Sequence, residues 1–335
     1  MEQHALVEAL MKPETYDETV RKIELVQTHI SFVFLAGDYV YKVKKPVNFG
    51  FLDFTTLEKR KFFCGRELEL NRRLAGDMYL EVVPINRSDN QIKIKGQGET
   101  IEYAVKMRRI PEDTMMSGLL EQNQVDNGLI DELAKKIAEF HAKAETGELI
   151  NNFGSLETIK FNWDENFDQT YDFIGRTINS SQFDLIHQKI QTFLKENQPL
   201  FRTRIEDGRI RDCHGDLHSG NIFIADRIYI FDCIEFNQRF RYSDVTADVA
   251  FLAMDLDFRN RRDLSTYFVD RYVEYSQDRT LLMLLHFYKC YRAYVRGKVI
   301  GFKLDDPNVE TLEKDLAKQE SRAYFDLATE YANEL

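Results

Sequence analysis

Residues 213–233 read CHGDLHSGNIFIADRIYIFDC and hold the densest set of polar side chains in this chain of 335 residues. A polar loop ends at Asn221, two short apolar segments joined by a turn at Asp226-Arg227 follow, and Asp232 comes directly after them. This pattern predicts two antiparallel strands that return the chain to its starting point, so Asp232 should lie beside Asp216 and Asn221. The two strands are expected at Asn221–Ala225 and Ile228–Phe231.

Asp216, Asn221 and Asp232 offer three oxygen-bearing side chains that can converge on one point. Carboxylate and amide oxygens suit Mg²⁺, which takes one or two protein carboxylates and leaves its other positions to water and phosphate. The division of roles that fits phosphoryl transfer makes Asp216 the base toward a substrate hydroxyl and gives the metal to Asn221 and Asp232. The alternative is a loop whose side chains only bond their own backbone, which explains one residue better than the whole string.

A second site should hold the triphosphate, and residues 38–44 supply a lysine for it. In a strand, side chains alternate between faces, so Val40, Lys42 and Lys44 should share one face. Lys42 follows an apolar residue on its own face, as in the V-A-I-K motif, where a small residue covers adenine and the lysine reaches the phosphates. Val40 and Lys42 are therefore the candidate nucleotide contacts, and Lys44 is the less favoured alternative.

The helix expected over Thr55–Leu74 provides an internal check on this choice. Its apolar stripe consists of Phe63, Leu70 and Leu74, and Glu67 lies within the same stripe. A carboxylate on an apolar face is costly to bury without a cation, so Glu67 should pair with Lys42. The alternative is a stripe that ends at Phe63, with Glu67 at its rim.

The order of the predicted elements favours an α+β protein with two lobes. Residues 1–110 are mostly strand-like with one long helix, and residues 111–335 are mostly helical apart from the two short strands. A hairpin is expected over Leu25–Lys44 around Gly37-Asp38, and the other strands and helices were assigned from periodicity. The strands are expected at Glu81–Pro84, Gln91–Lys95 and Ile101–Met107, and the helices at residues 129–144, 182–195, 264–275, 280–300 and 309–331.

Composition narrows the possible functions. The chain has 45 basic and 56 acidic residues and a net charge of -11, which opposes attraction to nucleic acids and anionic membrane surfaces. No apolar run approaches the length of a membrane span, and the amino terminus lacks the pattern of a signal peptide. Four scattered cysteines without a C-x-x-C motif suit free thiols. We therefore expect a cytoplasmic protein that binds neither nucleic acid nor membrane.

The motifs together resemble those of the aminoglycoside phosphotransferase-like kinases, which have a protein-kinase-like fold. The resemblance lies in His214-Gly-Asp216-Leu-His218-Ser-Gly-Asn221, in Phe231-Asp232 and in Asp244-Val-Thr-Ala-Asp248. Residues 28–31, 41–46 and 48–54 are similar to a bacterial branch of these kinases that is often fused to a P-loop ATPase domain. This sequence has no P-loop motif, so the chain is expected to act alone or with a separate protein partner.

The resemblance implies an enzyme that uses ATP and Mg²⁺ to phosphorylate a hydroxyl group of a small molecule. It makes Asp216 the catalytic base, assigns Mg²⁺ to Asn221 and Asp232, and uses Lys42 with Glu67 to orient the phosphates. It also makes Asp248 a structural carboxylate that braces the catalytic loop. An interlobe connection at Met107–Ile110 would bond adenine through its backbone, which makes Met107 and Arg109 nucleotide contacts.

Other functions remain open at this stage. A nucleotide-binding regulatory module without turnover, acting with a separate partner, would keep the same motifs, and so would a protein kinase. Gly215-Asp216-Leu217-His218 also matches the first motif of binuclear metallophosphoesterases, although their later motifs are missing. A zinc cluster of Cys213, His214, His218 and Cys233 is disfavoured by its spacing, and His141 is expected to be a core histidine.

Overall fold

The computed structural model describes residues 2–89, 91–307 and 309–335 and forms two compact units. The first unit comprises Met1–Leu119 and Gly220–Gln238, and the second comprises Leu120–Ser219 and Arg239–Leu335. The units interleave along the sequence because the strands after the polar loop pack with the amino-terminal residues. The division of functional roles between residues 1–110 and 111–335 stays a prediction.

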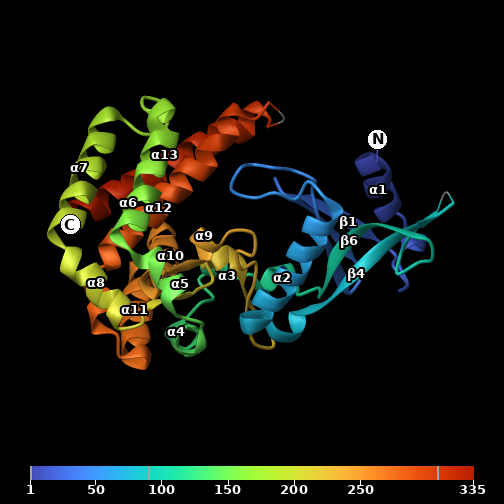
Figure 1. The fold of residues 1–335 in the computed structure, drawn as a ribbon, viewed down its shortest axis with the longest axis horizontal. Helices are drawn as coiled ribbons and strands as arrows, with labels where there is room; N and C mark the ends of the chain where they lie inside the picture. Colours follow the sequence, from blue (N-terminus) through green and yellow to red (C-terminus); the bar gives the residue numbers. More distant parts are fainter. Residues whose placement is uncertain (1, 90, 308) are drawn as a thin grey trace. The chain divides into compact units, whose positions relative to one another are not determined.

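The first unit is built on one antiparallel sheet with the order β1-β2-β3-β6-β4-β5 (Figure 1). The expected hairpin around Gly37-Asp38 is confirmed as β2 and β3, and β1 extends it by one strand. The six strands are β1 (Ile23–Gln27), β2 (Ser31–Ala36), β3 (Tyr39–Lys44), β4 (Tyr79–Ser88), β5 (Gln91–Ile94) and β6 (Glu99–Arg108).

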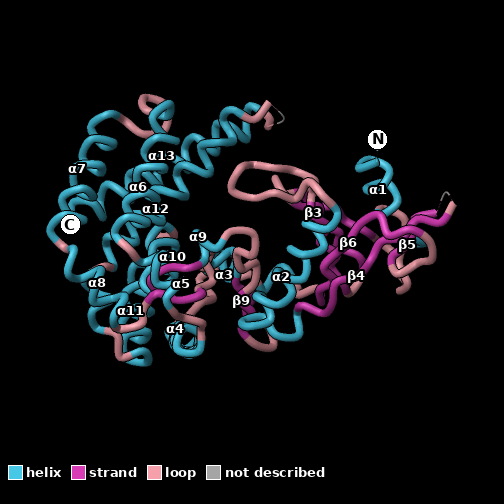
Figure 2. The backbone as a smooth tube through the Cα atoms, in the orientation of Figure 1, coloured by secondary structure: helices cyan, strands magenta, loops and turns pink. Residues whose placement is uncertain are grey.

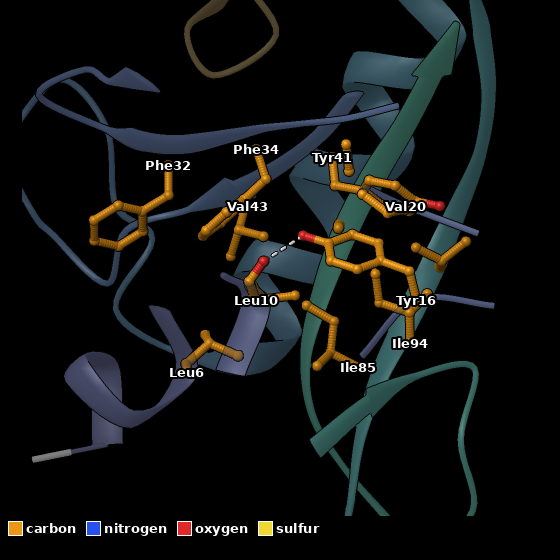
Figure 3. Close-up of a cluster of buried hydrophobic side chains, with 13 residues drawn as sticks. Leu6, Leu10, Tyr16, Val20, Phe32, Phe34, Tyr41, Val43, Ile85 and Ile94 are labelled. Atoms are coloured by element: carbon orange, nitrogen blue, oxygen red, sulfur yellow. Dashed lines mark hydrogen bonds between the residues drawn. The ribbon is translucent and has the colours of Figure 1, made fainter. Parts of the chain in front are cut away.

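The two faces of this sheet bury different sets of side chains. On one face Tyr41 and Val43 of β3 pack with residues from α1 (Glu2–Leu10), and Tyr16 donates a hydrogen bond of 2.6 Å to the Leu10 carbonyl (Figure 3). On the other face Val40 packs with Cys64 of α2 (Leu57–Ala75). The alternation expected for β3 is therefore present, and it directs Lys42 and Lys44 toward α2.

Local signals in the sequence fix the ends of α2. The Thr56 side chain accepts a hydrogen bond from the Lys59 backbone N–H and caps the first turn. At the other end Gly76 adopts a φ of 53°, which suits glycine and ends the helix. The helix agrees with the expected Thr55–Leu74 to within two residues, and it packs against β4 and β6.

The two short strands after the polar loop form an antiparallel ribbon in the first unit. β8 (Ile222–Ile224) pairs with β9 (Ile228–Ile230), with Ile222 opposite Ile230. Phe223 and Tyr229 of this ribbon join the cluster of Val40 and Cys64 beneath α2. The predicted ribbon is thus confirmed, and it belongs to the core of the sheet-containing unit.

The second unit is mainly helical, as Figure 2 shows, with one further ribbon of β7 (Ile210–Asp212) and β10 (Tyr242–Asp244). Helix α10 is almost wholly buried and packs against α11 and α12, and α12 packs against α13. The periodic stretches expected to be helical are α-helical apart from their ends, and the expected stretch 280–300 begins as a 3-10 helix before α12 starts at Leu285. The α-helices that follow β6 along the described chain are α3 (Met116–Glu121), α4 (Asn127–Lys143), α5 (Glu148–Asn151), α6 (Leu156–Thr170), α7 (Ser180–Glu196), α8 (Gln198–Glu206), α9 (Gln238–Arg241), α10 (Val245–Phe258), α11 (Arg262–Ser276), α12 (Leu285–Gly301) and α13 (Thr311–Asn333).

Short 3-10 helices connect several of these elements. They are Pro13–Thr15, Gly76–Met78, Glu112–Thr114, Asn152–Gly154, Tyr171–Phe173, Ser219–Asn221, Arg279–Met283 and Phe302–Asp305. Among the described residues, no helix combines the length and the apolar character that a bilayer crossing requires.

Candidate active site

Lys42 lies at the centre of a charged cluster within the first unit. Its Nζ is 2.9 Å from Oε1 of Glu67 and 2.6 Å from Oδ1 of Asp232. The strand β3 supplies the lysine, α2 supplies the glutamate, and the segment after β9 supplies the aspartate. The structure therefore brings together three of the predicted site residues from three separate parts of the chain.

Glu67 is completely buried, as its position in the apolar stripe of α2 predicts. Burial alone would raise its pKa, but the charges of Lys42 and Lys44 outweigh that effect and lower the pKa to about 2. Burial would lower the pKa of Lys42, but the negative charges of Asp232 and Glu67 outweigh burial and raise this pKa well above its ordinary value. Both members of the Lys42–Glu67 pair are therefore charged at neutral pH.

Lys44 and Glu235 belong to the same cluster, and the sequence analysis did not identify this pair. The Nζ of Lys44 is 2.7 Å from Oε2 of Glu67, and it also forms an ion pair with Glu235. Two lysines on one strand face require more than one carboxylate, which was a signal that a second acidic partner exists. Nothing in the sequence indicated that Glu235 was that partner.

Asn221 and Asp232 flank the same end of the β8–β9 ribbon. The Asn221 carbonyl accepts a hydrogen bond of 3.0 Å from the Phe231 N–H, so the residue next to Asp232 lies opposite Asn221. Asp232 adopts a φ of 61°, a conformation that aspartate tolerates better than most residues. After it, the Cys233 N–H donates to Oδ1 of Asn71 at 2.9 Å, which fixes the chain against α2.

The chemistry of this ribbon end fits Mg²⁺. Asn221 provides an amide oxygen and Asp232 a carboxylate whose side chain is 45% exposed, which are the hard oxygen ligands that this ion prefers. The partly exposed carboxylate also leaves room for the water and phosphate ligands that Mg²⁺ retains in nucleotide sites.

The loop that carries Asp216 lies in the second unit and is braced by Asp248. The Asp248 carboxylate accepts hydrogen bonds from the backbone N–H groups of His214 at 2.7 Å and Gly215 at 2.9 Å. Its Oδ2 is also 3.3 Å from Nε2 of His141, and Gly215 adopts a φ of 87° that suits glycine. The bracing role expected of Asp248 is confirmed, and His141 is a buried histidine that supports it.

Electrostatics keep Asp248 ionised. Burial would raise the pKa of this carboxyl, but the hydrogen bond and charge of His141, together with His214 and Arg292, lower it to about 2. Arg292 also donates to the Gly215 carbonyl at 3.0 Å, so both the N–H and the carbonyl group of Gly215 have a fixed side-chain partner.

Asp216 itself has a half-buried side chain. Its Oδ2 is 3.6 Å from Nε2 of His218, and its backbone N–H donates to Nδ1 of His214 at 3.3 Å. Burial would raise the pKa of Asp216, but the charges of His218 and Arg296 outweigh burial and hold the pKa well below its usual range. The side chain is therefore ionised and able to accept a hydrogen bond from a hydroxyl group.

The predicted base and the two predicted metal ligands fall in two units, with Asp216 in the second and Asn221 and Asp232 in the first. The expected convergence of all three stays a prediction. Within the first unit, the return of Asp232 to the end of the ribbon that begins at Asn221 is observed.

The remaining predicted nucleotide contacts lie on the sheet. Val40 and Met107 are paired directly across β3 and β6, and both are buried on the α2 face. Arg109 lies just beyond β6, where its side chain forms ion pairs with Glu24 at 3.7 Å and Glu112 at 3.5 Å. Its N–H donates to the Asp38 carbonyl at 2.8 Å, so this N–H is not available to adenine.

The zinc cluster considered above draws its residues from both units, with Cys233 in the first and Cys213 in the second, and the chain has four buried cysteines. All four are free thiols, and the group of metal-type ligands found among these residues consists of His141, Cys213 and Asp248. Both oxygens of Asp248 already accept backbone hydrogen bonds, so this group braces the loop that carries Asp216.

Comparison with known sequences identifies relatives that share most of this chain. Uncharacterised proteins from Mycobacterium bovis and Mycobacterium tuberculosis are each 35% identical to it over 278 residues, which is 83% of this chain. The aligned part is 54% of each relative, so the chain spans about half the length of these curated relatives.

Solved structures resemble the fold across the whole chain. A choline/ethanolamine kinase family protein from Mesorhizobium loti matches with a TM-score of 0.54 at 13% identity, covering 100% of this chain and 99% of that one. A candidate aminoglycoside phosphotransferase from Ralstonia eutropha matches with a TM-score of 0.53 at 13% identity, covering 99% and 98% of the two chains. These similarities support the α+β, protein-kinase-like fold expected from the motifs.

A family profile described as the phosphotransferase enzyme family matches residues 65–283. The matched region includes Glu67, the braced loop with Asp216, and the ribbon with Asn221 and Asp232. The chain therefore belongs to the aminoglycoside phosphotransferase-like family of phosphotransferases.

Proposed function

We propose that this phosphotransferase moves the terminal phosphoryl group of ATP, in the presence of Mg²⁺, to a hydroxyl group of a small molecule. The observation that carries the proposal is the position of Lys42, whose ammonium group contacts both Glu67 and Asp232. This arrangement places a fixed cation beside a partly exposed carboxylate, as binding of a metal-bound phosphate chain requires.

The nucleotide side of the reaction is assigned to residues of the first unit. Val40 and Met107 would contact adenine, Lys42 would bind phosphate oxygens, and Asn221 with Asp232 would hold Mg²⁺. When bound, Mg²⁺ would neutralise phosphate charge during the transfer. Glu67 keeps Lys42 charged and oriented, so the lysine reaches the phosphates in a fixed geometry.

Asp216 is assigned to the acceptor side. Its ionised carboxylate would accept the hydroxyl proton as the acceptor oxygen forms a bond to phosphorus. The bond between phosphorus and the bridging oxygen breaks, and its electron pair leaves with ADP. The backbone contacts of Asp248 and Arg292 support this role because they hold the loop that presents Asp216.

An assay of ATP consumption against a panel of small hydroxyl compounds, with and without Mg²⁺, tests the proposal. Replacing Asp216 with Asn should lower turnover by about 10²–10⁴-fold, because proton acceptance is lost. Affinity for MgADP, measured by calorimetry, should change much less. Unchanged turnover in Asp216→Asn with an identified acceptor would remove Asp216 from the mechanism.

Two other outcomes identify the alternative functions. Tight MgADP binding without turnover of any acceptor would favour a nucleotide-binding regulatory module that acts with a separate protein partner. Phosphate transfer to a protein and to no small molecule would favour a protein kinase. The proposal places the enzyme in the cytoplasm, where ATP and Mg²⁺ are available and its free thiols stay reduced.

A further inference from the structure

The charged cluster in the first unit is a linear series of five groups. Asp232 contacts Lys42, Lys42 contacts Glu67, Glu67 contacts Lys44, and Lys44 contacts Glu235. The two lysines use different oxygens of Glu67, Oε1 for Lys42 and Oε2 for Lys44. The carboxylate of Glu67 is therefore held from both sides, and its orientation depends on both lysines.

The two ends of the series differ in their access to solvent. At one end the Lys42 side chain is 12% exposed and the Asp232 side chain 45% exposed. At the other end the Lys44 side chain is 1% exposed and that of Glu235 is 4% exposed, and Lys44 also lies 4.9 Å from the centre of the Phe54 ring. A nucleotide can reach the first end, whereas the second is enclosed by protein.

This difference separates the tasks of the two lysines. Phosphates and a metal ion at the open end would give Lys42 and Asp232 new partners. Lys44 and Glu235 cannot exchange partners in this way, because protein surrounds them. Glu67 therefore keeps one fixed cation on Oε2, which leaves Oε1 directed at Lys42 while Lys42 binds its ligand.

We propose that Lys44 and Glu235 are positioning residues, which hold Glu67 so that Lys42 is presented to the phosphates of the nucleotide. The inference rests on the nucleotide-binding role proposed above and adds a second, enclosed ion pair to it. It also accounts for two lysines on one face of β3, because only the outer lysine contacts ligand and the inner one fixes the shared carboxylate.

A double-mutant cycle on MgADP affinity tests this inference. The inner pair is removed as Lys44→Met with Glu235→Gln, so that no buried charge is left without its partner. Lys42→Met with Glu67→Gln removes the outer lysine together with its buried partner and should weaken MgADP binding by about 10–100-fold, since it deletes hydrogen bonds between charged groups. In the wild-type background, loss of the inner pair should weaken binding by about 3–10-fold, because Lys42 loses its fixed orientation.

In the background that carries Lys42→Met and Glu67→Gln, loss of the inner pair should change MgADP affinity less than about 2-fold, because the residues through which it acts are gone. A purely structural role would weaken binding equally in both backgrounds and would overturn the inference. Unchanged affinity after loss of the inner pair from the wild type would overturn it as well. Absence of MgADP binding by the wild-type chain would instead overturn the proposed function, and the inference with it.

Lys106 and Glu18 provide the matched control. They form an ion pair in the same unit, and Lys106 lies on the opposite face of the sheet, against Tyr39 and Tyr41. Lys106→Met with Glu18→Gln should leave MgADP affinity unchanged within about 2-fold, because this pair has no contact with Glu67. Urea unfolding of each variant shows that the chains compared are folded.

Discussion

Asp248 is the residue on which the geometry of the Asp216 loop depends most directly. Replacing Asp248 with Asn leaves one oxygen to accept two backbone N–H groups and removes the charge that pairs with His141. We expect the free energy of unfolding to fall by about 2–4 kcal/mol, because buried donors lose their acceptor. Urea denaturation measures this loss.

An exposed aspartate gives the comparison for Asp248. Asp263 pairs with Arg261 at 2.9 Å, and its side chain is 64% exposed. Asp263→Asn should change the unfolding free energy by less than about 0.5 kcal/mol. Equal effects of the two substitutions would show that the Asp248 brace contributes nothing beyond an ordinary surface charge.

At the scale of elements, α2 contains a glycine that its conformation does not require. Gly65 lies in the middle of the helix on its solvent-exposed side, and a Cβ added there would meet nothing within 4 Å. Gly65→Ala should therefore raise the unfolding free energy by about 0.5–1 kcal/mol, because alanine loses less backbone entropy. Thermal and urea unfolding should both report the gain, with MgADP affinity unaltered.

Gly98, in the turn before β6, is predicted to respond in the opposite direction. It has a φ of 97°, and an added Cβ would lie 2.1 Å from the Arg87 carbonyl oxygen, a backbone atom that cannot move aside. Gly98→Ala should lower the unfolding free energy by at least about 2 kcal/mol. A neutral result would mean that the turn between β5 and β6 can change its conformation freely.

These elements also show what the sequence could and could not predict. Alternation along residues 39–44 predicted which side chains of β3 face α2, because a strand has only two faces. Apolar spacing placed Glu67 on the buried side of α2 for the same reason. Glu235 was not predicted, because its partner Lys44 is distant in sequence and no periodic pattern connects a loop residue to a strand.

Across the whole molecule, too, local structure could be predicted from the sequence, whereas contacts between distant residues could not. The ribbon that returns Asp232 to Asn221 is a local structure and was predictable from the apolar segments and their turn. Helix α10 carries Asp248 but is buried on nearly every side, so it has no amphipathic period that would predict a helix. Its role was inferred from the family motif, and its contacts required the structure.

The stability of the whole chain should depend on pH through Lys298 of α12. Its Nζ lies 2.6 Å from the amide oxygens of both Asn166 and Gln169, and its residue is 8% exposed. Burial lowers its pKa from 10.5 to about 8, so between these two values the unfolded chain binds more protons than the folded chain. Stability linked to Lys298 must therefore rise with pH in this range.

Lys298→Met removes this dependence while keeping a side chain of similar length. The free energy of unfolding of the wild type, measured relative to Lys298→Met by urea denaturation, should increase by about 2 kcal/mol between pH 7 and pH 10. Buried tyrosines also titrate at high pH, but they are common to both chains and cancel in the difference. A flat difference across this range would mean that Lys298 keeps its ordinary pKa in the folded protein, and that its amide partners and residual water offset its burial.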